Sequence, residues 1–251
     1  MAFRGLLAAI GIGGASVETV LDRDSVEVGQ ALDGRITMTG GSVEQAVDDV
    51  RLELLTRVEH EVNDQRQHRT HVIASWSLGR KLMLQPGQSV GEAFSIDVPY
   101  HTPLHVPGAP VHVWLRTSLS IPMAVDATDE DAVHVHPDRA MASVFDAMEM
   151  LGFRLAKSDV EHRPRWHGGH GYVQEFEFRP STRRNLRFDE IEIVFEQRAH
   201  GLDLLIQVDR SARGFGGFLL EATGADESWY RLTVPRAGAR AVADAIASVL
   251  R

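Results

Sequence analysis

The sequence of 251 residues contains no cysteine. It can therefore form no disulfide, no thiolate metal site and no thiol nucleophile, and it is compatible with a cytoplasmic location. No stretch is long and apolar enough to span a bilayer. Positive charge is scarce, since 26 Lys and Arg stand against 35 Asp and Glu and give a formal net charge of −9. This balance argues against a general nucleic-acid binder and a polybasic membrane binder.

Signatures of catalysis are missing as well. The motifs G-x-S-x-G, H-E-x-x-H and S-x-x-K do not occur, so we expect no enzymatic activity and no cofactor. The glycine-rich stretch 214–218, GFGGF, is not followed by the Lys-Ser or Lys-Thr of a phosphate-binding loop, and its spacing is not that of a dinucleotide-binding turn. It predicts a packed turn in which glycine permits a left-handed backbone.

The acidity is confined to one half of the chain, which favours two domains. Residues 1–137 carry 10 Lys and Arg against 18 Asp and Glu, whereas residues 138–251 carry 16 against 17. At the start of the chain, Phe3, Leu6, Leu7 and Ile10 fall at helical spacing. They predict an amphipathic helix that docks on the body of the protein rather than a cleaved signal peptide.

Strict alternation of apolar and polar residues dominates from residue 16 to 136. In the segment 111–119, for example, Val, Leu and Thr alternate with polar or amphipathic residues, and Gly- and Pro-rich turns separate such segments. This pattern is typical of half-buried antiparallel strands and of a β-sandwich. Alternation returns in 172–178, 191–195 and 202–208, which predicts a second sandwich.

Two helices are expected in addition. In 138–151 the apolar residues recur at helical spacing, with Asp138 as a cap and Gly152 as a stop. A second helix follows Pro235 near the end of the chain. The fold class predicted is mostly β, with two arrestin-like β-sandwich domains in tandem and helices at the N-terminus, between the domains and at the C-terminus. The predicted domains are a sandwich over 1–137, a connecting helix over 138–152 and a second sandwich over 153–251 that ends in a helix.

Several segments together indicate a known family. In the first half they are GIGGASVETVLDRDSVEVGQALDGRITMTGGSVEQAVDDVRLEL and VWLRTSLSIPMAVDATDED, and in the second MEMLGFRLAKSD, VQEFEFRP and VDRSARGFGGFLLEATGADES. On these the chain resembles, nearly end to end, the SpoOM family of arrestin-like bacterial sporulation-control proteins. The resemblance implies a β-sandwich interaction module, and hence an adaptor or regulator in sporulation, cell-cycle or stress physiology.

Two charged clusters are candidate surfaces for a protein partner. The first is an acidic segment that we expect to be a solvated loop, and the second is an arginine-rich segment that we expect in a hairpin loop. The predicted partner-binding residues are Asp126, Asp129, Glu130, Asp131, Arg179, Arg183, Arg184 and Arg187. The partner is another protein of unknown identity, and an arginine loop meeting an acidic domain also leaves self-association open.

Histidines provide the alternative hypothesis. His134 and His136 are two residues apart, so they share one face of a strand, and Asp138 is a candidate third ligand. Solvent-facing imidazoles on a strand whose valines face the core explain the same pattern. The alternative is therefore a metal- or small-ligand-binding protein that uses the histidine-rich segments.

Overall fold

The computed structural model describes residues 13–62, 65–108, 110–164, 169–182, 188–198, 201–209, 229–234 and 238–250. The expected N-terminal helix and the glycine-rich stretch 214–218 lie outside these ranges. The chain divides into two compact units. The N-terminal unit comprises residues 1–57, 69–102 and 112–136, and the C-terminal unit comprises residues 58–68, 103–111 and 137–251.

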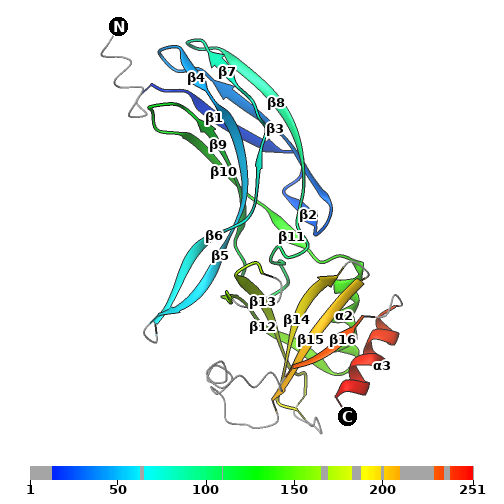
Figure 1. Ribbon diagram of the computed structural model, residues 1–251. Helices are drawn as coiled ribbons and strands as arrows, with labels where there is room; N and C mark the ends of the chain where they lie inside the picture. Colours follow the sequence, from blue (N-terminus) through cyan, green and yellow to red (C-terminus); the bar gives the residue numbers. More distant parts are fainter. Residues whose placement is uncertain are drawn as a thin grey trace. The chain divides into compact units, whose positions relative to one another are not determined.

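The N-terminal unit is built almost entirely from strands, most of them paired antiparallel (Figure 1). Its strands are β1 (Ser16–Leu21), β2 (Ser25–Glu27), β3 (Ala31–Thr39), β4 (Gln45–Val47), β5 (Asp49–Val62), β6 (Gln65–Ser77), β7 (Leu82–Leu84), β8 (Ser89–Asp97), β9 (Val113–Ser120), β10 (Ala127–Ala132) and β11 (His134–His136). One sheet has the order β1-β3-β8, and a second places β9 between β10 and β5, with β6 on β5. Residues from 58 in β5 and up to 68 in β6 belong to the C-terminal unit.

Alternating side chains form the core between these two sheets. Ile36 and Met38 in β3 are fully buried, as are Leu115 and Leu119 in β9. Because successive side chains of a strand point to opposite faces, each strand presents one apolar row to the opposite sheet and one polar row to water. The predicted β-sandwich is therefore present in this unit.

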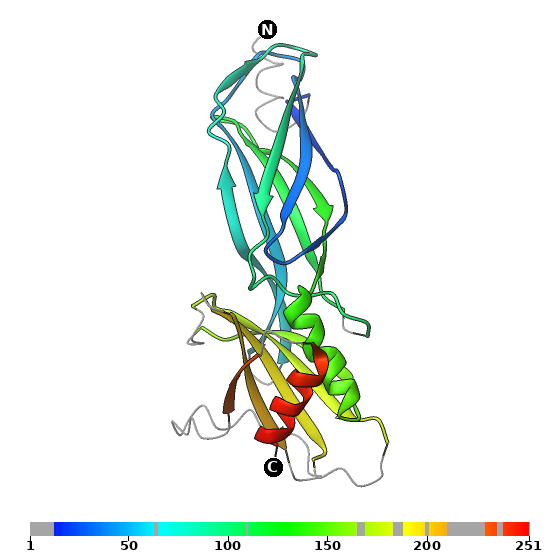
Figure 2. The ribbon, with the colours of Figure 1, turned by 90° about the vertical axis from the view of Figure 1, so that its right-hand side faces the viewer.

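The C-terminal unit is a sheet with helices on one face. Its further elements are α2 (Arg139–Met150), β12 (Phe153–His162), β13 (Tyr172–Pro180), β14 (Glu190–Arg198), β15 (Gly201–Asp209), β16 (Trp229–Thr233) and α3 (Ala239–Val249). Strands β12 to β16 pair in sequence order, all antiparallel. Figure 2 shows α2 and α3 side by side over the sheet.

Aromatic packing joins the helices to the sheet. The ring of Phe145 in α2 lies 5.3 Å from Phe176 in an edge-to-face arrangement and 5.7 Å from Phe195, measured between ring centroids. The mostly β class and the two helices are confirmed. The layer on one face of the described strands of 153–251 is helical and is formed by α2 and α3. Alternating strands require an apolar layer above them, and their pattern does not say whether that layer is a sheet or a pair of helices.

Candidate functional site

The acidic segment does not form a loop, because residues 127–132 are strand β10. Asp129 points inward, and its Oδ2 accepts a hydrogen bond of 2.6 Å from the backbone N–H of Thr19 in the opposite sheet. Asp126 Oδ1 accepts one of 3.0 Å from Ile121 N–H. Both predicted docking residues therefore bind backbone within their own unit. The expected solvated loop is a strand instead, because residues 127–132 pair with β9 along their whole length.

The other two acids of β10 face opposite ways. Glu130 is exposed and pairs with Arg116 of β9 at 2.7 Å. Asp131 faces inward, and its Oδ2 is buried without a hydrogen-bond partner among the described residues. Burial raises the pKa of Asp131, and the charges of Asp129 and Glu18 raise it further. Of the three acids in β10, Glu130 is thus the one whose side chain is exposed.

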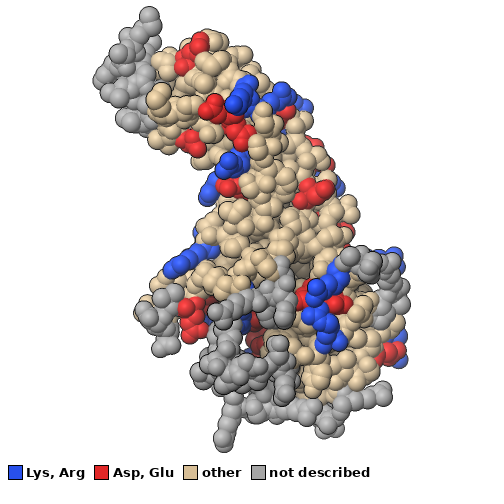
Figure 3. Space-filling view, in the orientation of Figure 1, with Lys and Arg blue, Asp and Glu red and all other residues tan. Residues whose placement is uncertain are grey.

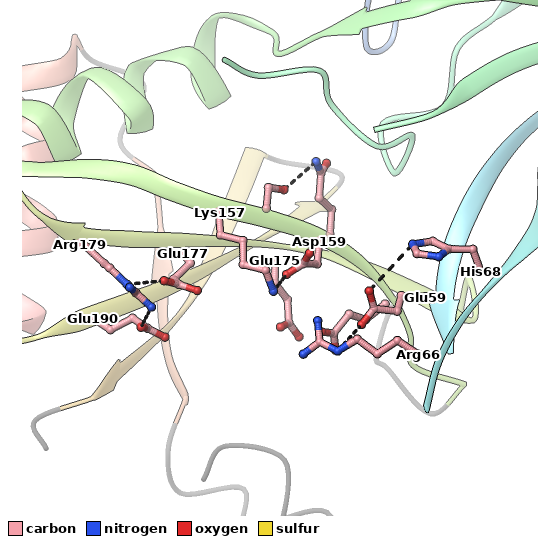
Figure 4. Close-up of polar contacts among 12 residues, drawn as sticks. Glu59, Arg66, His68, Lys157, Asp159, Glu175, Glu177, Arg179 and Glu190 are labelled. Atoms are coloured by element: carbon pink, nitrogen blue, oxygen red, sulfur yellow. Dashed lines mark hydrogen bonds and ion pairs between the residues drawn. The ribbon is translucent and has the colours of Figure 1, made fainter. Parts of the chain in front are cut away.

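Arg179 belongs to the face of the C-terminal sheet that is opposite the helices. Its guanidinium pairs with Glu177 at 2.5 Å and with Glu190 at 3.1 Å (Figure 4). Arg183, Arg184 and Arg187 lie outside the described residues. The ladder registers place further acids on the same face, which we call the carboxylate face: Asp159, Glu161, Glu175, Glu177, Glu190, Glu192, Glu196 and Asp203.

Arginines neutralise only part of the carboxylate face. Arg163 lies 3.1 Å from Glu161 and 3.3 Å from Glu175, and Arg231 lies 2.6 Å from Glu196. Burial raises the pKa of Glu192 to about 7, with the charges of neighbouring glutamates adding to the effect. Burial also raises the pKa of Glu161, where Arg163 opposes the rise. This face can therefore exchange protons near neutral pH.

Sequence reasoning missed the carboxylate face. Alternation in the segments 172–178 and 191–195 does show that the glutamates point away from the phenylalanines and isoleucines. That these carboxylates are half-buried, with valines packed among them, follows only from the tertiary structure. Val173, Val194 and Leu205 form a small buried cluster on this face, against which Trp229 packs.

The three candidate metal ligands of the histidine hypothesis have separate positions and roles in the structure. His134 and His136 are exposed on β11, while Val135 between them is buried. Asp138 caps α2, where its side chain accepts a hydrogen bond of 2.8 Å from Met141 N–H. Within the described ranges, no group of three or more His, Asp or Glu residues is arranged to hold a metal ion. None of the described helices is long and apolar enough to cross a membrane.

The sheet β1-β3-β8 has two unequal edges. At one edge, Asp129 of β10 reaches the backbone of β1, as described above. At the other edge is β8, which pairs with β3 and with no second strand among those described. Phe94 and Ile96 hold β8 in the core. Its other row consists of the exposed residues Ser89, Gly91, Ala93, Ser95 and Asp97.

Together these features define a mostly β protein with a sandwich unit and a helix-covered sheet. Comparisons with known proteins agree. A family model described as SpoOM protein matches residues 3–212. Sporulation-control protein spo0M of Bacillus subtilis (strain 168) is 34% identical over 234 residues, 92% of this chain and 89% of that protein. The chain belongs to the SpoOM family of sporulation-control proteins, as the sequence segments predicted.

A solved structure is similar over the same extent. The crystal structure of Spo0M, sporulation control protein, from Bacillus subtilis matches with a TM-score of 0.86 and 30% sequence identity. The match covers 95% of this chain and 98% of that chain. Both the N-terminal sandwich and the C-terminal helix-covered sheet are therefore shared with a member of the family.

Proposed function

We propose that this chain is a non-enzymatic, arrestin-like adaptor or regulatory protein of the cytoplasm that works by binding another protein. The name of its relative, Sporulation-control protein spo0M, supports a regulatory role in sporulation, cell-cycle or stress physiology. The observation that carries the proposal is the edge strand β8, described above. An unpaired edge offers a row of backbone N–H and C=O groups to an extended peptide.

β8 is better suited to strand addition than β16 and β6, which are also edge strands. It is nine residues long, and the exposed residues before Asp97 all have small side chains. Its one other charged residue, Glu92, is paired with Arg80 at 2.7 Å. By contrast, β16 has five residues and exposes Tyr230 and Arg231, and β6 carries Arg66, His68 and Arg69. Charged and bulky edges of that kind discourage a further strand.

The proposed mechanism is the addition of an extended segment of the partner to β8. Main-chain hydrogen bonds to the edge supply affinity, and side chains at alternate positions of the peptide supply specificity. Small residues at 91, 93 and 95 leave room for larger side chains on the neighbouring peptide strand. Such binding requires no metal, cofactor or nucleophile.

Affinity capture from native lysate with matched edge variants tests this proposal. Gly91→Lys and Ala93→Lys place an edge lysine on β8, and at position 91 a Cβ meets its nearest neighbours at 3.8 and 4.0 Å, an ordinary contact distance. Capture of a reproducible partner should fall at least tenfold in both variants. Thr70→Lys, on the exposed part of β6, is the matched control. Unchanged capture in the β8 variants would refute the site.

The acidic segment is tested in the same assay as a secondary contact. Glu130→Lys reverses a charge that faces solvent and leaves the hydrogen bonds of Asp126 and Asp129 in place. Electrostatic docking there would be supported if the variant binds with a lower on-rate than the wild type at low salt and the difference shrinks as the salt concentration rises. Binding that is indifferent to Glu130→Lys at every salt concentration would remove this segment from the proposal.

A further inference from the structure

The turn between β9 and β10 holds a methionine in an unfavourable backbone conformation. The N–H of Ala124 donates to the carbonyl oxygen of Ile121 at 3.2 Å, with Pro122 and Met123 between them. Met123 has a φ of 56°, and it is the one non-glycine residue with positive φ among those described. The third position of such a turn favours glycine or asparagine, because a Cβ is crowded there.

The turn is fixed by its surroundings. Ile121 is 6% exposed and so anchors the start of the turn in the core. Asp126 Oδ1 accepts the Ile121 N–H at 3.0 Å, and the ladder resumes directly where Ala127 pairs with Leu119. The strained conformation is therefore held by the contacts around the turn and does not depend on the Met123 side chain.

The apolar side chains at the tip contribute nothing to the core. Met123 is 97% exposed and Val125 is 62% exposed, the highest values among the exposed large hydrophobic residues of the described chain. Folding thus holds an apolar pair in water, and one member adopts a backbone that its residue type disfavours. Strain of this kind persists at sites where it serves binding or catalysis.

We propose that Met123 and Val125 form a docking knob that inserts into an apolar pocket of a partner protein whose rim carries Lys and Arg. A methionine side chain is unbranched and polarisable, and it adapts to the shape of a pocket. The negative charges around the turn favour a partner pocket that has Lys and Arg at its rim. No Lys or Arg occurs between Arg116 and Arg139, whereas Asp126 is in the turn and Asp48 donates its backbone N–H to Ser120 at 2.9 Å.

The same charges argue against two other occupants. A bilayer with anionic headgroups repels an acidic tip, and so does the acidic half of a second copy, residues 1–137, with 10 Lys and Arg against 18 Asp and Glu. The inference rests on the proposed function, because it also requires a protein partner. It concerns a turn that is separate from β8, so the two surfaces can be tested independently.

Site-specific photocrosslinking in native host cells tests the knob. A diazirine analogue of methionine is placed at position 123 of the full chain, and at position 83 of β7, where the methionine is 49% exposed, as the control. Position 123 should give one dominant adduct, mapped to an apolar pocket flanked by Lys or Arg. Unlabelled wild-type chain should compete, and unlabelled Met123→Asn should compete roughly tenfold or more less effectively.

Other outcomes overturn the knob. They are adducts to lipid, adducts to a second copy, or the same pattern from positions 123 and 83. Gly91→Lys should leave the adduct from position 123 in place. If capture is unchanged in the β8 variants while position 123 gives its expected adduct, the knob stands and the edge site is refuted.

Met123→Asn should raise Tm by roughly 1–3 °C, because asparagine adopts positive φ more readily. A lowered Tm would contradict the strain on which the knob rests.

Discussion

At the scale of single residues, a few polar groups hold the two sheets of the N-terminal sandwich together. The hydroxyls of Thr19 in β1 and Thr117 in β9 lie 2.6 Å apart in the core. Asp129 accepts the backbone N–H of Thr19 beside them. Buried donors must find partners, because an unsatisfied one carries a desolvation penalty. Asp129 thus binds one outer N–H of β1, whereas β8, at the other edge of the sheet, pairs with β3 alone.

Asp129→Ala should lower the free energy of unfolding by about 1–3 kcal/mol, because it leaves the Thr19 N–H without its partner. Asp129→Asn keeps an acceptor oxygen and should recover most of the loss. Glu130→Ala, which removes only a surface ion pair with Arg116, should change stability by less than about 1 kcal/mol. Urea unfolding of the three variants gives the comparison. Equal effects for Asp129→Ala and Glu130→Ala would contradict the assignment.

The carboxylate face predicts how stability changes with pH. The pKa of Glu192 is raised to about 7 in the folded protein, so the folded state binds this proton more tightly than the unfolded state does. Stability is therefore present in full below the ordinary glutamate pKa and is lost as the pH rises toward 7. For one half-exposed glutamate the loss is on the order of 1–2 kcal/mol after solvent screening.

Thermal unfolding between pH 5 and pH 8 measures this effect. Tm of the wild type should fall across the interval, and Glu192→Gln should flatten the fall, because glutamine resembles the protonated side chain and cannot ionise. Glu149→Gln, at an exposed position of α2, changes the charge equally and should leave the profile as it was. A steeper fall in Glu192→Gln would show that the charge at 192 stabilises the fold.

At the scale of secondary-structure elements, α2 packs its apolar face against the C-terminal sheet. Met141, Val144, Ala147 and Met148 are its buried residues, and Phe145 reaches across to the phenylalanines of β13 and β14. Phe145→Ala should lower the free energy of unfolding by about 2–4 kcal/mol through a cavity and lost aromatic contacts. Met150→Ala, at a half-exposed end of the helix, is the control. Comparable losses in both would argue against the packing described here.

Periodicity predicted most elements but not all of their surroundings. The alternation in 111–119 and the helical spacing in 138–151 correspond to β9 and α2, because both patterns are local. The acidic segment 126–131 was expected in a loop, but residues 127–132 form β10. Their strand is specified instead by pairing with β9 and by the contact of Asp129 with Thr19, 110 positions away.

The candidate sites were less predictable than the elements. Arg179 was singled out from its sequence cluster, but its partners Glu177 and Glu190 depend on the pairing of β13 with β14. Met123 gave no sequence signal, because positive φ at a methionine contradicts its residue preference. Pro122 in the preceding position was a sign of a turn. The strand that forms the unpaired edge of a sheet is determined by the whole fold.

At the scale of the whole molecule, charge of both signs is interspersed over the visible face (Figure 3). The chain belongs to the SpoOM family, and its proposed adaptor role depends on backbone geometry at β8 rather than on a catalytic constellation. Specificity would then reside in the sequence of the partner's added strand.

The most direct test of this central claim is amide hydrogen exchange of the purified chain, free and in complex with the captured partner. The account predicts slower exchange for amides within 89–97 on binding, because an added strand pairs with the outer groups of β8. Amides of β1, which lies at the opposite edge of the sheet, should change little. A stable complex that leaves exchange in 89–97 unaltered would contradict strand addition at β8.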